Sequence, residues 1–438
     1  MTLAALITKI HNKQASIAVI GLGYVGLPVA ALFAEKGFDV LGVEVRQDRV
    51  DIINSGRSPI EGDEPGLADL IEKVVSGKNF KATTDYNLLK DRDIILIDVE
   101  TPVNDAHVPE YRALRAALQS LAVVMKPGVL VIIESTIMPG TMKNIALPLL
   151  EEMSGGKCNQ NFFLGNCPER VMPGRLLQNL KKMKRVVGGG SPETAEAMLA
   201  LYNHIVEDEI DKADWITAEL VKTVENAYRD VQIAFANEVA LISEALGADV
   251  WRVRELVRKS PGREMLLPGA GVGGHCIPKD PWLLASSVQG LGVPIRLIPA
   301  ARAINSSMPL HIKTLLERRL GSFKRKKILV LGYAYLENSD DTRESPAAVL
   351  VDALQEDGAE CVIHDPFVRE YNGNLVAMGT GCDAAVLMTA HEDYRQMDYN
   401  ALKQAMRNPL LVDGRNALDK DAAIASGFSL VRLGDTTF

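Results

Sequence analysis

The residues best suited to covalent chemistry lie in one short segment, GVGGHCIPKD at 271–280. Cys276 follows three glycines there, and Lys279 and Asp280 come shortly after it. Glycines allow sharp turns and the close approach of a ligand, which a buried structural thiol does not need. A nucleophilic thiol needs access and positive potential, which the glycines and Lys279 supply, while Asp280 can take a proton or position a water. The alternative is an inert core thiol.

A glycine-rich segment near the start of the chain suggests a binding site for a second reactant in that thiol chemistry. The run SIAVIG at 16–21 has the pattern of a strand, and GLGYVG at 21–26 leads from it into an apolar helical pattern. In such a unit Gly21 permits the tight turn, Gly23 lets a pyrophosphate approach, and Gly26 allows close helix–sheet packing. This context predicts a dinucleotide-binding turn, and a glycine-rich turn without a ligand is the alternative.

The next predicted strand, at 39–45, bears on the choice of dinucleotide. Glu44 near its end can bond a ribose diol and repels a 2′-phosphate, so NAD is predicted rather than NADP. Arg46 follows closely enough to keep NADP open.

Polar residues also end three further runs, at 93–99, 129–136 and 161–174. Ligands bind at the carboxyl ends of strands in open parallel sheets, so these side chains are expected near a cofactor or substrate. They are Thr101, Ser135, Thr136, Cys167, Glu169 and Arg170. Each alone is equally compatible with an ordinary loop.

A thiol and a nicotinamide site together predict a four-electron oxidation. An alcohol loses a hydride to give an aldehyde, a thiolate adds to the aldehyde, and the hemithioacetal loses a second hydride. Water then hydrolyses the thioester to an acid, so two NAD are consumed per turnover.

One long helix is predicted from 217 to 246, a stretch without glycine or proline. Its apolar side chains recur at steps of three and four residues and are Val221, Val224, Tyr228, Val231, Phe235, Val239, Ile242 and Leu246. A polar stripe on one side consists of Glu219, Lys222, Asn226 and Arg229. A solvated face explains the stripe, although Asn226 is a poor mid-helix residue and suggests a selected hydrogen bond. Such a helix is long enough to link two lobes and to pair with a second subunit.

A second α/β domain is predicted after the basic connector RRLGSFKRKK. Strand-like runs occur at 327–335, 359–366, 383–390 and 410–416, with a helix at 346–357. The first of these strands lacks a GxGxxG turn and leads into a polar loop in which Arg343 and Ser345 precede the helix. An arginine at a helix N-terminus suits an anionic ligand, and a capped surface loop is the alternative.

The composition of the whole chain sets limits for these sites. Its 438 residues suffice for two or three domains, and 47% hydrophobic with 24% charged residues is ordinary for a globular protein. The net charge of −8 argues against nucleic acid as a partner. We expect no membrane span and no signal peptide, and hence a cytoplasmic location. Five dispersed cysteines without a CxxC pair argue against disulfides and structural zinc, so no metal is expected.

The chain resembles the nucleotide-sugar dehydrogenase family, which includes UDP-glucose, GDP-mannose and UDP-N-acetylhexosamine 6-dehydrogenases. The resemblance covers nearly the whole length and rests on the segments IAVIGLGYVGLPVA, STIMPGT, CPERVMPG, KTVENAYRDVQIAFANE, GVGGHCIPKDPW and DDTRESP. It implies an α/β fold with two Rossmann-like doubly wound domains joined by a central helical region with a long helix. The implied domains are an NAD-binding domain at 1–205, a central dimerisation domain with the cysteine loop at 206–318, and a UDP-sugar-binding domain at 319–438.

The resemblance also implies roles for single residues. Cys276 matches the nucleophile of the family, and Lys222 and Asn226 match a helix pair that contacts the sugar and its developing oxyanion. Glu169 matches an acid implicated in thioester hydrolysis, and Arg343 matches an arginine that contacts the nucleotide.

Three sets of site residues are therefore expected. The catalytic set is Cys276, Lys222, Asn226, Asp280, Thr136 and Glu169, of which Asp280 and Thr136 match groups around the catalytic water. The NAD-binding set is Gly21, Gly23, Tyr24, Val25, Gly26, Glu44, Arg46, Thr101, Ser135 and Thr136. The substrate-binding set is Glu169, Arg170, Lys222, Asn226, Arg263, Gly273, Lys279 and Arg343.

The function predicted from the sequence is NAD-dependent oxidation of the 6-hydroxyl of a UDP-N-acetylhexosamine to the uronate. The forms PERVMPG and YRDVQIAFANE look most like the UDP-N-acetylmannosamine branch, with UDP-N-acetylglucosamine, UDP-N-acetylgalactosamine and UDP-glucose as alternatives. Two rivals are a two-electron dehydrogenase that stops after one hydride and a nucleotide-binding sensor without chemistry. We expect a homodimer that serves polysaccharide biosynthesis.

Overall fold

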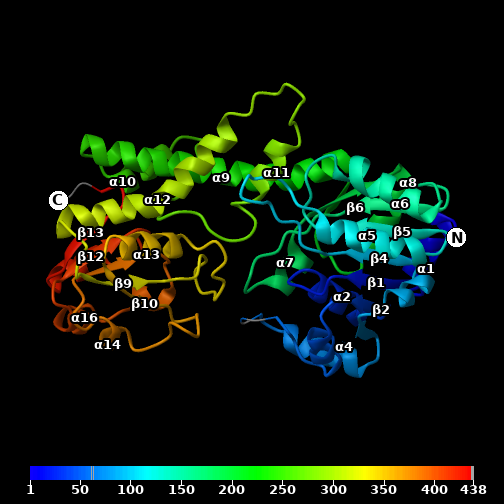
Figure 1. Cartoon of the computed structure of the whole chain (residues 1–438), viewed down its shortest axis with the longest axis horizontal. Helices are drawn as coiled ribbons and strands as arrows, with labels where there is room; N and C mark the ends of the chain where they lie inside the picture. Colours follow the sequence, from blue (N-terminus) through cyan, green and yellow to red (C-terminus); the bar gives the residue numbers. More distant parts are fainter. Residues whose placement is uncertain (61, 63, 436–438) are drawn as a thin grey trace. The chain divides into compact units, whose positions relative to one another are not determined.

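The structure of the chain is a computed structural model, which describes residues 1–60, 62 and 64–435 (Figure 1). It divides into two compact units. The first comprises Met1–Glu225 and Trp282–Val293, and the second comprises Asn226–Pro281 and Pro294–Phe438. Each unit contains a sheet of mainly parallel strands with helices on both faces, so the predicted fold class is confirmed. The predicted division into three domains stays a prediction.

The first unit is built, within its described residues, on an eight-stranded sheet with the order β3-β2-β1-β4-β5-β6-β7-β8. The strands are β1 (Ser16–Ile20), β2 (Asp39–Val43), β3 (Phe80–Thr83), β4 (Ile94–Ile97), β5 (Val129–Ile133), β6 (Phe162–Asn166), β7 (Arg185–Gly189) and β8 (Ile210–Asp214). Neighbours pair in parallel except β6 and β7. The central strands β4 and β5 contain only Ile, Leu and Val and are buried, as expected for parallel strands covered on both faces. The carboxyl ends of β1, β4, β5 and β6 share one edge.

Helices cover both faces of this sheet (Figure 1). One face packs against α1 (Leu3–His11), α2 (Gly26–Glu35), α3 (Gln47–Asn54), α4 (Leu67–Ser76), α7 (Leu176–Lys182) and α8 (Pro192–Tyr202). The other face packs against α5 (Arg112–Val124), a π-helical turn at Met142–Ala146 and α6 (Leu147–Ser154). The edge at which β1, β4, β5 and β6 end is thus framed by two helical layers.

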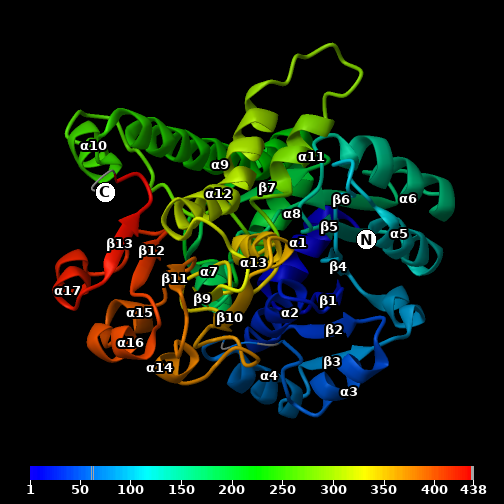
Figure 2. The ribbon, with the colours of Figure 1, turned by 60° about the vertical axis from the view of Figure 1, so that its left-hand side comes forward.

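The second unit contains a smaller parallel sheet with the order β10-β9-β11-β12-β13, which can be followed from orange to red in Figure 2. Its strands are β9 (Lys327–Leu331), β10 (Glu360–His364), β11 (Ala384–Leu387), β12 (Leu410–Asp413) and β13 (Ser429–Arg432). One face packs against α12 (Leu297–Leu320) and α13 (Pro346–Glu356), and the other against α15 (Glu392–Arg395), α16 (Tyr399–Ala405) and α17 (Lys420–Ala425), with α14 (Leu375–Met378) beside them. Ser345 caps α13 by accepting from the amide of Ala347 at 3.1 Å.

The predicted long helix is α9 (Trp215–Leu246), which is followed by α10 (Val250–Val257). Its buried side carries small or polar residues, namely Ala218, Glu219, Lys222, Thr223, Ala227, Asp230, Ala234, Ala236, Asn237, Ala240 and Ser243. In the second unit this side meets α12, where Arg302 donates to Asp230 at 2.7 Å and Asn237 donates to Asn305 at 2.8 Å. Several of its large apolar side chains are exposed, namely Ile216, Leu220, Val224, Tyr228, Phe235, Ile242 and Leu246, whereas Val239 and Leu241 pack against buried clusters.

In the part of the chain that the structure describes, we find no helix with the length and apolar character needed to cross a membrane.

Candidate active site

The turn after β1 is packed on one side and open on the other. Gly21 has a φ of 92°, a value that favours glycine, and a Cβ there would meet the backbone that follows β4. A Cβ at Gly26 would meet the carbonyl oxygen of Gly21. At Gly23, by contrast, no heavy atom of the described residues lies within 4 Å of such a Cβ. This open side continues through Tyr24 and Val25 into α2, so the turn fits a dinucleotide pyrophosphate.

Glu44 lies beside this turn, directly after β2, and is buried. Its carboxylate accepts hydrogen bonds from the backbone amides of Leu22 at 3.2 Å and Arg46 at 3.1 Å. An acidic group in contact with the turn is placed to bind a ribose diol. The Arg46 side chain is exposed and donates to Asp48 at 3.2 Å. Its guanidinium therefore pairs with a carboxylate in the first turn of α3.

The predicted polar residues that follow β4 and β5 are brought together. The Thr101 hydroxyl donates to the carbonyl oxygen of Thr136 at 2.6 Å. The Ser135 hydroxyl donates to the carbonyl oxygen of Val99, also at 2.6 Å. These two bonds join the loops at the edge of the sheet where the turn after β1 lies.

Glu219 on α9 fixes the next turn of the same edge. Its carboxylate accepts hydrogen bonds from the backbone amides of Gly140 at 2.7 Å and Met142 at 2.8 Å. Burial raises the pKa of Glu219 to about 7, although these amides act in the opposite direction. In the sequence, Glu219 is only a member of the polar stripe, because its partners lie 79 and 77 residues away along the chain.

Glu169 is buried where the chain leaves β6. Its carboxylate forms an ion pair with Arg185, the first residue of β7. Burial raises the pKa of Glu169 to about 7, while Arg185 and Lys222 lower it and Glu134 raises it. Lys222 is a buried residue of α9, so two residues of the predicted catalytic set influence each other within the first unit. A carboxyl group with a pKa near neutrality can exchange a proton at physiological pH.

Arg170, next to Glu169, is bound by protein groups. Its guanidinium donates to the Glu225 carboxylate of α9 at 2.8 Å and 2.5 Å and to the carbonyl oxygen of Lys184. Arg170 therefore fastens the loop after β6 to α9. Arg170 was predicted to bind the substrate, and in the structure its positive charge is paired with the carboxylate of Glu225.

In the second unit, the glycine-rich loop presents Cys276 at the surface. The backbone amides of Lys279 and Asp280 donate to the carbonyl oxygen of Cys276 at 3.1 Å and 2.8 Å, which places the thiol on a tight turn. A Cβ at Gly273 would lie 2.7 Å from the Cβ of Tyr335, so a larger residue would push the loop away. The loop is therefore held close to the polypeptide behind it while its thiol stays accessible.

Asp280 connects this loop to α9. The Asn226 side-chain amide donates to Asp280 Oδ2 at 2.5 Å, and the Lys279 ammonium lies 3.5 Å from Oδ1. The Asp280 side chain is fully buried. Three residues of the predicted site therefore form one hydrogen-bonded and ionic group beside Cys276.

Charged groups of both signs act on His275, which precedes the cysteine. The backbone amide of Gly274 donates to the carbonyl oxygen of Arg343 at 2.9 Å, which holds the loop before α13 against the cysteine loop. The pKa of His275 is lowered to about 4 by burial and then by Lys279 and Arg343. His275 is therefore neutral at physiological pH, and the carboxylates of Asp280 and Asp341 act on it in the direction opposite to the two cations.

Two predicted substrate arginines differ in their surroundings. The Arg343 side chain is 46% exposed and donates to Asp341 at 2.9 Å and 3.1 Å. The exposed side chain of Arg263 donates to the carbonyl oxygen of Pro261 at 3.5 Å. The second unit thus brings together Asn226, Gly273, Cys276, Lys279, Asp280 and Arg343, whereas the hydrogen bond of Arg263 is to its own loop.

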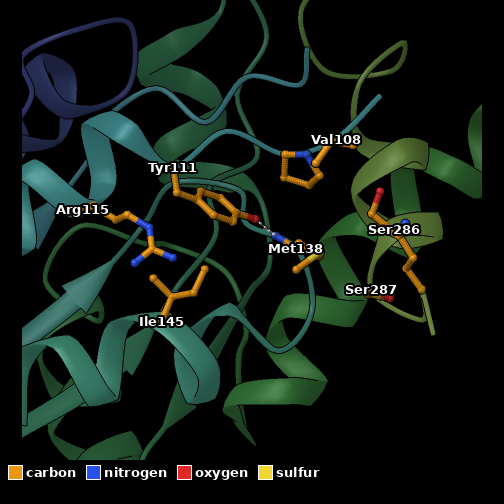
Figure 3. Close-up of a pocket in the computed structure, with 9 residues that line it drawn as sticks. Val108, Tyr111, Arg115, Met138, Ile145, Ser286 and Ser287 are labelled. Atoms are coloured by element: carbon orange, nitrogen blue, oxygen red, sulfur yellow. Dashed lines mark hydrogen bonds between the residues drawn. The ribbon is translucent and has the colours of Figure 1, made fainter. Parts of the chain in front are cut away.

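A cavity of about 480 Å³ opens in the first unit beside the turn that follows β5 (Figure 3). It is lined by Val108, Pro109, Tyr111, Arg115, Met138, Ile145, Ser286, Ser287 and Gln289. The dashed line in Figure 3 marks the hydrogen bond from the backbone amide of Met138 to the Tyr111 hydroxyl, at 2.7 Å. These nine residues include no member of the predicted sets, so the cavity borders the predicted cofactor edge without being part of it.

Models of three domains of one family match the chain. The NAD binding domain of the UDP-glucose/GDP-mannose dehydrogenase family matches residues 15–206. The central domain of the same family matches residues 216–307, and its UDP binding domain matches residues 329–420.

Individual relatives match along nearly the whole length. A UDP-N-acetyl-D-mannosamine dehydrogenase from Pyrococcus horikoshii is 38% identical over 96% of this chain and 99% of its own. The solved structure of a UDP-D-ManNAc dehydrogenase from the same organism has a TM-score of 0.91 at 37% identity and covers 97% of this chain and 100% of that one. The structure of an NDP-N-acetyl-D-galactosaminuronic acid dehydrogenase from Methanosarcina mazei has a TM-score of 0.86 at 35% identity and covers 99% of this chain and 98% of that one.

Proposed function

Because the chain belongs to the UDP-glucose/GDP-mannose dehydrogenase family and is therefore an NAD-dependent oxidoreductase, we propose that it oxidises the 6-hydroxyl of UDP-N-acetylmannosamine to the uronate. The name of the Pyrococcus horikoshii relative supports the mannosamine sugar. The name of the Methanosarcina mazei structure supports an N-acetylgalactosamine sugar as the second candidate.

The proposed reaction removes four electrons from one carbon. Bound NAD supplies the hydride acceptor. Loss of a hydride and a proton turns the C6 alcohol into an aldehyde, and the Cys276 thiolate adds to the aldehyde carbon to form a hemithioacetal. Loss of a second hydride gives a thioester. Water then attacks the thioester carbon, the C–S bond breaks, and the sulfur leaves as the thiolate.

We assign the remaining steps to residues whose environment suits them. Lys222 and Asn226 lie one helical turn apart on α9 and are assigned to the reacting hydroxyl and its developing negative charge. Asp280 holds Asn226 through the 2.5 Å hydrogen bond and is assigned to water near the thiol. Glu169, with a pKa of about 7, is the proposed base for thioester hydrolysis, and Thr136 is assigned to the same water.

The surroundings of Cys276 are the observation on which this proposal depends. The thiol is exposed, its loop cannot accept side chains in place of its glycines, and two cations, Lys279 and Arg343, lie close to the preceding His275. A dehydrogenase that stops after one hydride needs none of these features. They suit a thiolate that must add to a carbonyl carbon.

The yield of NADH per sugar tests the proposal. Wild-type protein should form about two NADH per UDP-N-acetylmannosamine, because each uronate requires two hydride transfers. Cys276→Ser should give one NADH or fewer, since a hydroxyl is a far weaker nucleophile than a thiolate. Cys158→Ser, which changes a half-buried cysteine of the first unit, is the matched control and should keep the wild-type yield. Equal uronate formation by Cys276→Ser and wild type would refute the nucleophile.

A panel of UDP-sugars tests the substrate separately. We expect turnover of UDP-N-acetylmannosamine, and turnover of UDP-N-acetylgalactosamine if the second candidate holds. Turnover of UDP-glucose alone would overturn both assignments. Discrimination between epimers depends on one hydroxyl or acetamido group and its hydrogen-bond partner, so activities should differ by orders of magnitude.

We also propose that two copies of the chain pair through α9. The exposed apolar side chains of this helix support the proposal, because burying them against a second copy removes their surface from water. Sedimentation of wild type and of the double variant Tyr228→Glu/Phe235→Glu tests it, and a fully active wild-type monomer would contradict it. The three-domain division, a cytoplasmic location and a role in polysaccharide biosynthesis stay predictions.

A further inference from the structure

Four ionisable side chains are enclosed together at the carboxyl edge of the first sheet. Asp98 follows β4, Glu134 follows β5, Glu169 follows β6, and Arg185 begins β7. Both carboxylate oxygens of Asp98 and Oε2 of Glu134 are shielded from solvent, and Glu169 and Arg185 are 6% and 3% exposed. Three carboxyl groups therefore share surroundings with one guanidinium.

The hydrogen-bond donors of this cluster reach only some of its carboxylate oxygens. Arg185 pairs with Glu169, and its guanidinium lies 5.0 Å from the centre of the Tyr202 ring. The Tyr202 hydroxyl donates to Glu134 Oε1 at 2.5 Å. From the residues that the structure describes, Glu134 Oε2 and both carboxylate oxygens of Asp98 receive no hydrogen bond. Unpaired buried carboxylates of this kind are strongly unfavourable.

A proton between the two carboxyl groups resolves this conflict. Asp98 and Glu134 lie within hydrogen-bonding reach of each other. Burial, and then the charge of Glu134, raise the pKa of Asp98 well above its ordinary value. One shared proton gives each carboxyl group a partner and reduces the charge of the pair from two to one. The titratable groups that act on the pair and on Glu169 are Cys167, Arg185, Tyr202 and Lys222.

We propose that Asp98 and Glu134 share one proton and act, through Arg185, as positioning residues for Glu169 in hydrolysis of the Cys276 thioester. The inference rests on the proposed function, because that function assigns Glu169 to this step. The single negative charge of the pair competes with Glu169 for Arg185. With a neutral pair, Arg185 would hold Glu169 as a permanent carboxylate and make it a weaker base.

The proposal has a consequence for the pH dependence of hydrolysis. Glu169 must be ionised to act as a base, so the hydrolysis rate rises with pH through its pKa. Removing the negative charge of the pair favours ionised Glu169 and lowers its pKa. The rise should then move to lower pH, and the plateau above it should fall because the base is weaker.

Three variants of nearly unchanged shape separate the possibilities. Asp98→Asn and Glu134→Gln each keep a donor between the two side chains and leave one negative charge, so both should keep the wild-type pH dependence. The double variant removes that charge. The increase of its hydrolysis rate with pH should therefore occur about one pH unit lower than in the wild type. Glu196→Gln, which removes an exposed carboxylate paired with Lys212, is the control and should change nothing. Acyl-enzyme and uronate are followed by rapid quench, with the first NADH of the same samples as an internal reference.

Each outcome decides the proposal. A shift already present in both single variants would show two ionised carboxylates and overturn the shared proton. A double variant without a shift would overturn the positioning role. If the double variant does not fold, infrared spectroscopy decides, because the wild type should show the C=O band of a buried carboxylic acid that Asp98→Asn removes. A wild type that forms one NADH per sugar would defeat the proposed function alone, since the infrared band still reports the proton.

Discussion

The turn after β1 and the turn after β9 hold the same place in their sheets, and they are built from the same parts. Both strands lie between two parallel neighbours, and both turns contain a glycine with positive φ, Gly21 at 92° and Gly332 at 85°. In each unit a carboxylate directly follows the neighbouring strand, Glu44 after β2 and Asp365 after β10. The two turns nevertheless offer different space to a ligand.

In the second unit, the carboxylate fills the turn. Asp365 Oδ2 accepts hydrogen bonds from the backbone amides of Tyr333 at 2.7 Å and Ala334 at 2.8 Å, and it lies 3.1 Å from His391 Nε2. The amides that a phosphate would need therefore already bind an anion of the protein. In the first unit, Glu44 stands to one side at Leu22, and the approach to Gly23 is open. Topology supplies the position of a dinucleotide site, but the local carboxylate decides whether the site exists.

The largest effect on NAD binding is expected when the open space of the first turn is filled. Gly23→Val places a side chain in the open space, so the Kd for NAD should rise by about 100-fold, or about 2.7 kcal/mol, while the melting temperature stays unchanged. Ala334→Val in the second turn is the matched variant. Ala334 is fully buried, so this change should lower the melting temperature and leave NAD affinity unchanged. Titration calorimetry and thermal melting separate the two, and wild-type affinity in Gly23→Val would refute a ligand in this turn.

A smaller effect is expected when the second turn loses its anion. Burial raises the pKa of Asp365, but its bonds with His391 and the turn amides outweigh burial and lower the pKa to about 2. The folded-state pKa lies below the ordinary value of 3.8, so the carboxylate stabilises the fold above about pH 4 and loses this contribution as the pH falls towards 2. The side chain is fully enclosed, and the contribution is about 2 kcal/mol.

Asp365→Asn should therefore lower the free energy of unfolding of the second unit at neutral pH. Urea unfolding followed by hydrogen exchange in β9 and β10 measures this unit by itself. The difference between wild type and variant should shrink as the pH is lowered from 5 to 3. A difference that stays constant over this range would show that the charge of Asp365 is not its source. Asp357→Asn, at an exposed ion pair with Lys313, is the control.

The elements around both turns could be predicted from the sequence, because their signals are local. The apolar run at 129–136 contains β5, the stretch from 217 to 246 lies within α9, and GLGYVG marks the first turn. The strands β3, β7, β8 and β13 and the helix α1 are not among the predicted elements, since these strands contain no more than two consecutive apolar residues and α1 precedes the first recognisable strand. Local patterns also left open which face of α9 is buried. Small side chains such as Ala227 and Ala234 allow close packing, so the larger residues are the exposed ones.

The candidate site could be predicted only where a residue type suggests its own chemistry. Cys276 among glycines and Asn226 within a helix are unusual in the sequence, and both lie in the group around Asp280. Asp98 and Glu134 merely end apolar strands, and their proximity depends on the pairing of β4 with β5. Arg185 reaches Glu169 because β7 runs antiparallel to β6. Such contacts between distant residues need the assembled sheet.

A third substitution tests whether the carboxylate of the first turn selects the cofactor. Glu44→Ala removes the acceptor for a ribose diol and the charge that repels a 2′-phosphate, so the preference for NAD over NADP should narrow by about tenfold. The ratio of kcat/KM for the two cofactors measures the preference. Glu44→Gln should lie between wild type and Glu44→Ala, because it keeps an oxygen acceptor but loses the charge. Equal use of both cofactors by the wild type would contradict the assignment of Glu44.

The smallest effect is expected at Arg46, the cation nearest to Glu44 in the sequence. Its side chain is 64% exposed and paired with Asp48, so Arg46→Ala should change the Kd for NAD by less than about twofold, as for other exposed ion pairs. Arg49→Ala is the matched substitution, because Arg49 donates to the carbonyl oxygen of Leu22 in the turn at 2.9 Å. Arg49→Ala should therefore weaken NAD binding more than Arg46→Ala does. Arg46→Ala could instead weaken NADP binding strongly and leave NAD binding unchanged. Arg46 would then turn away from Asp48 towards the 2′-phosphate of NADP. In that case the carboxylate of Glu44 alone would not explain the choice of cofactor.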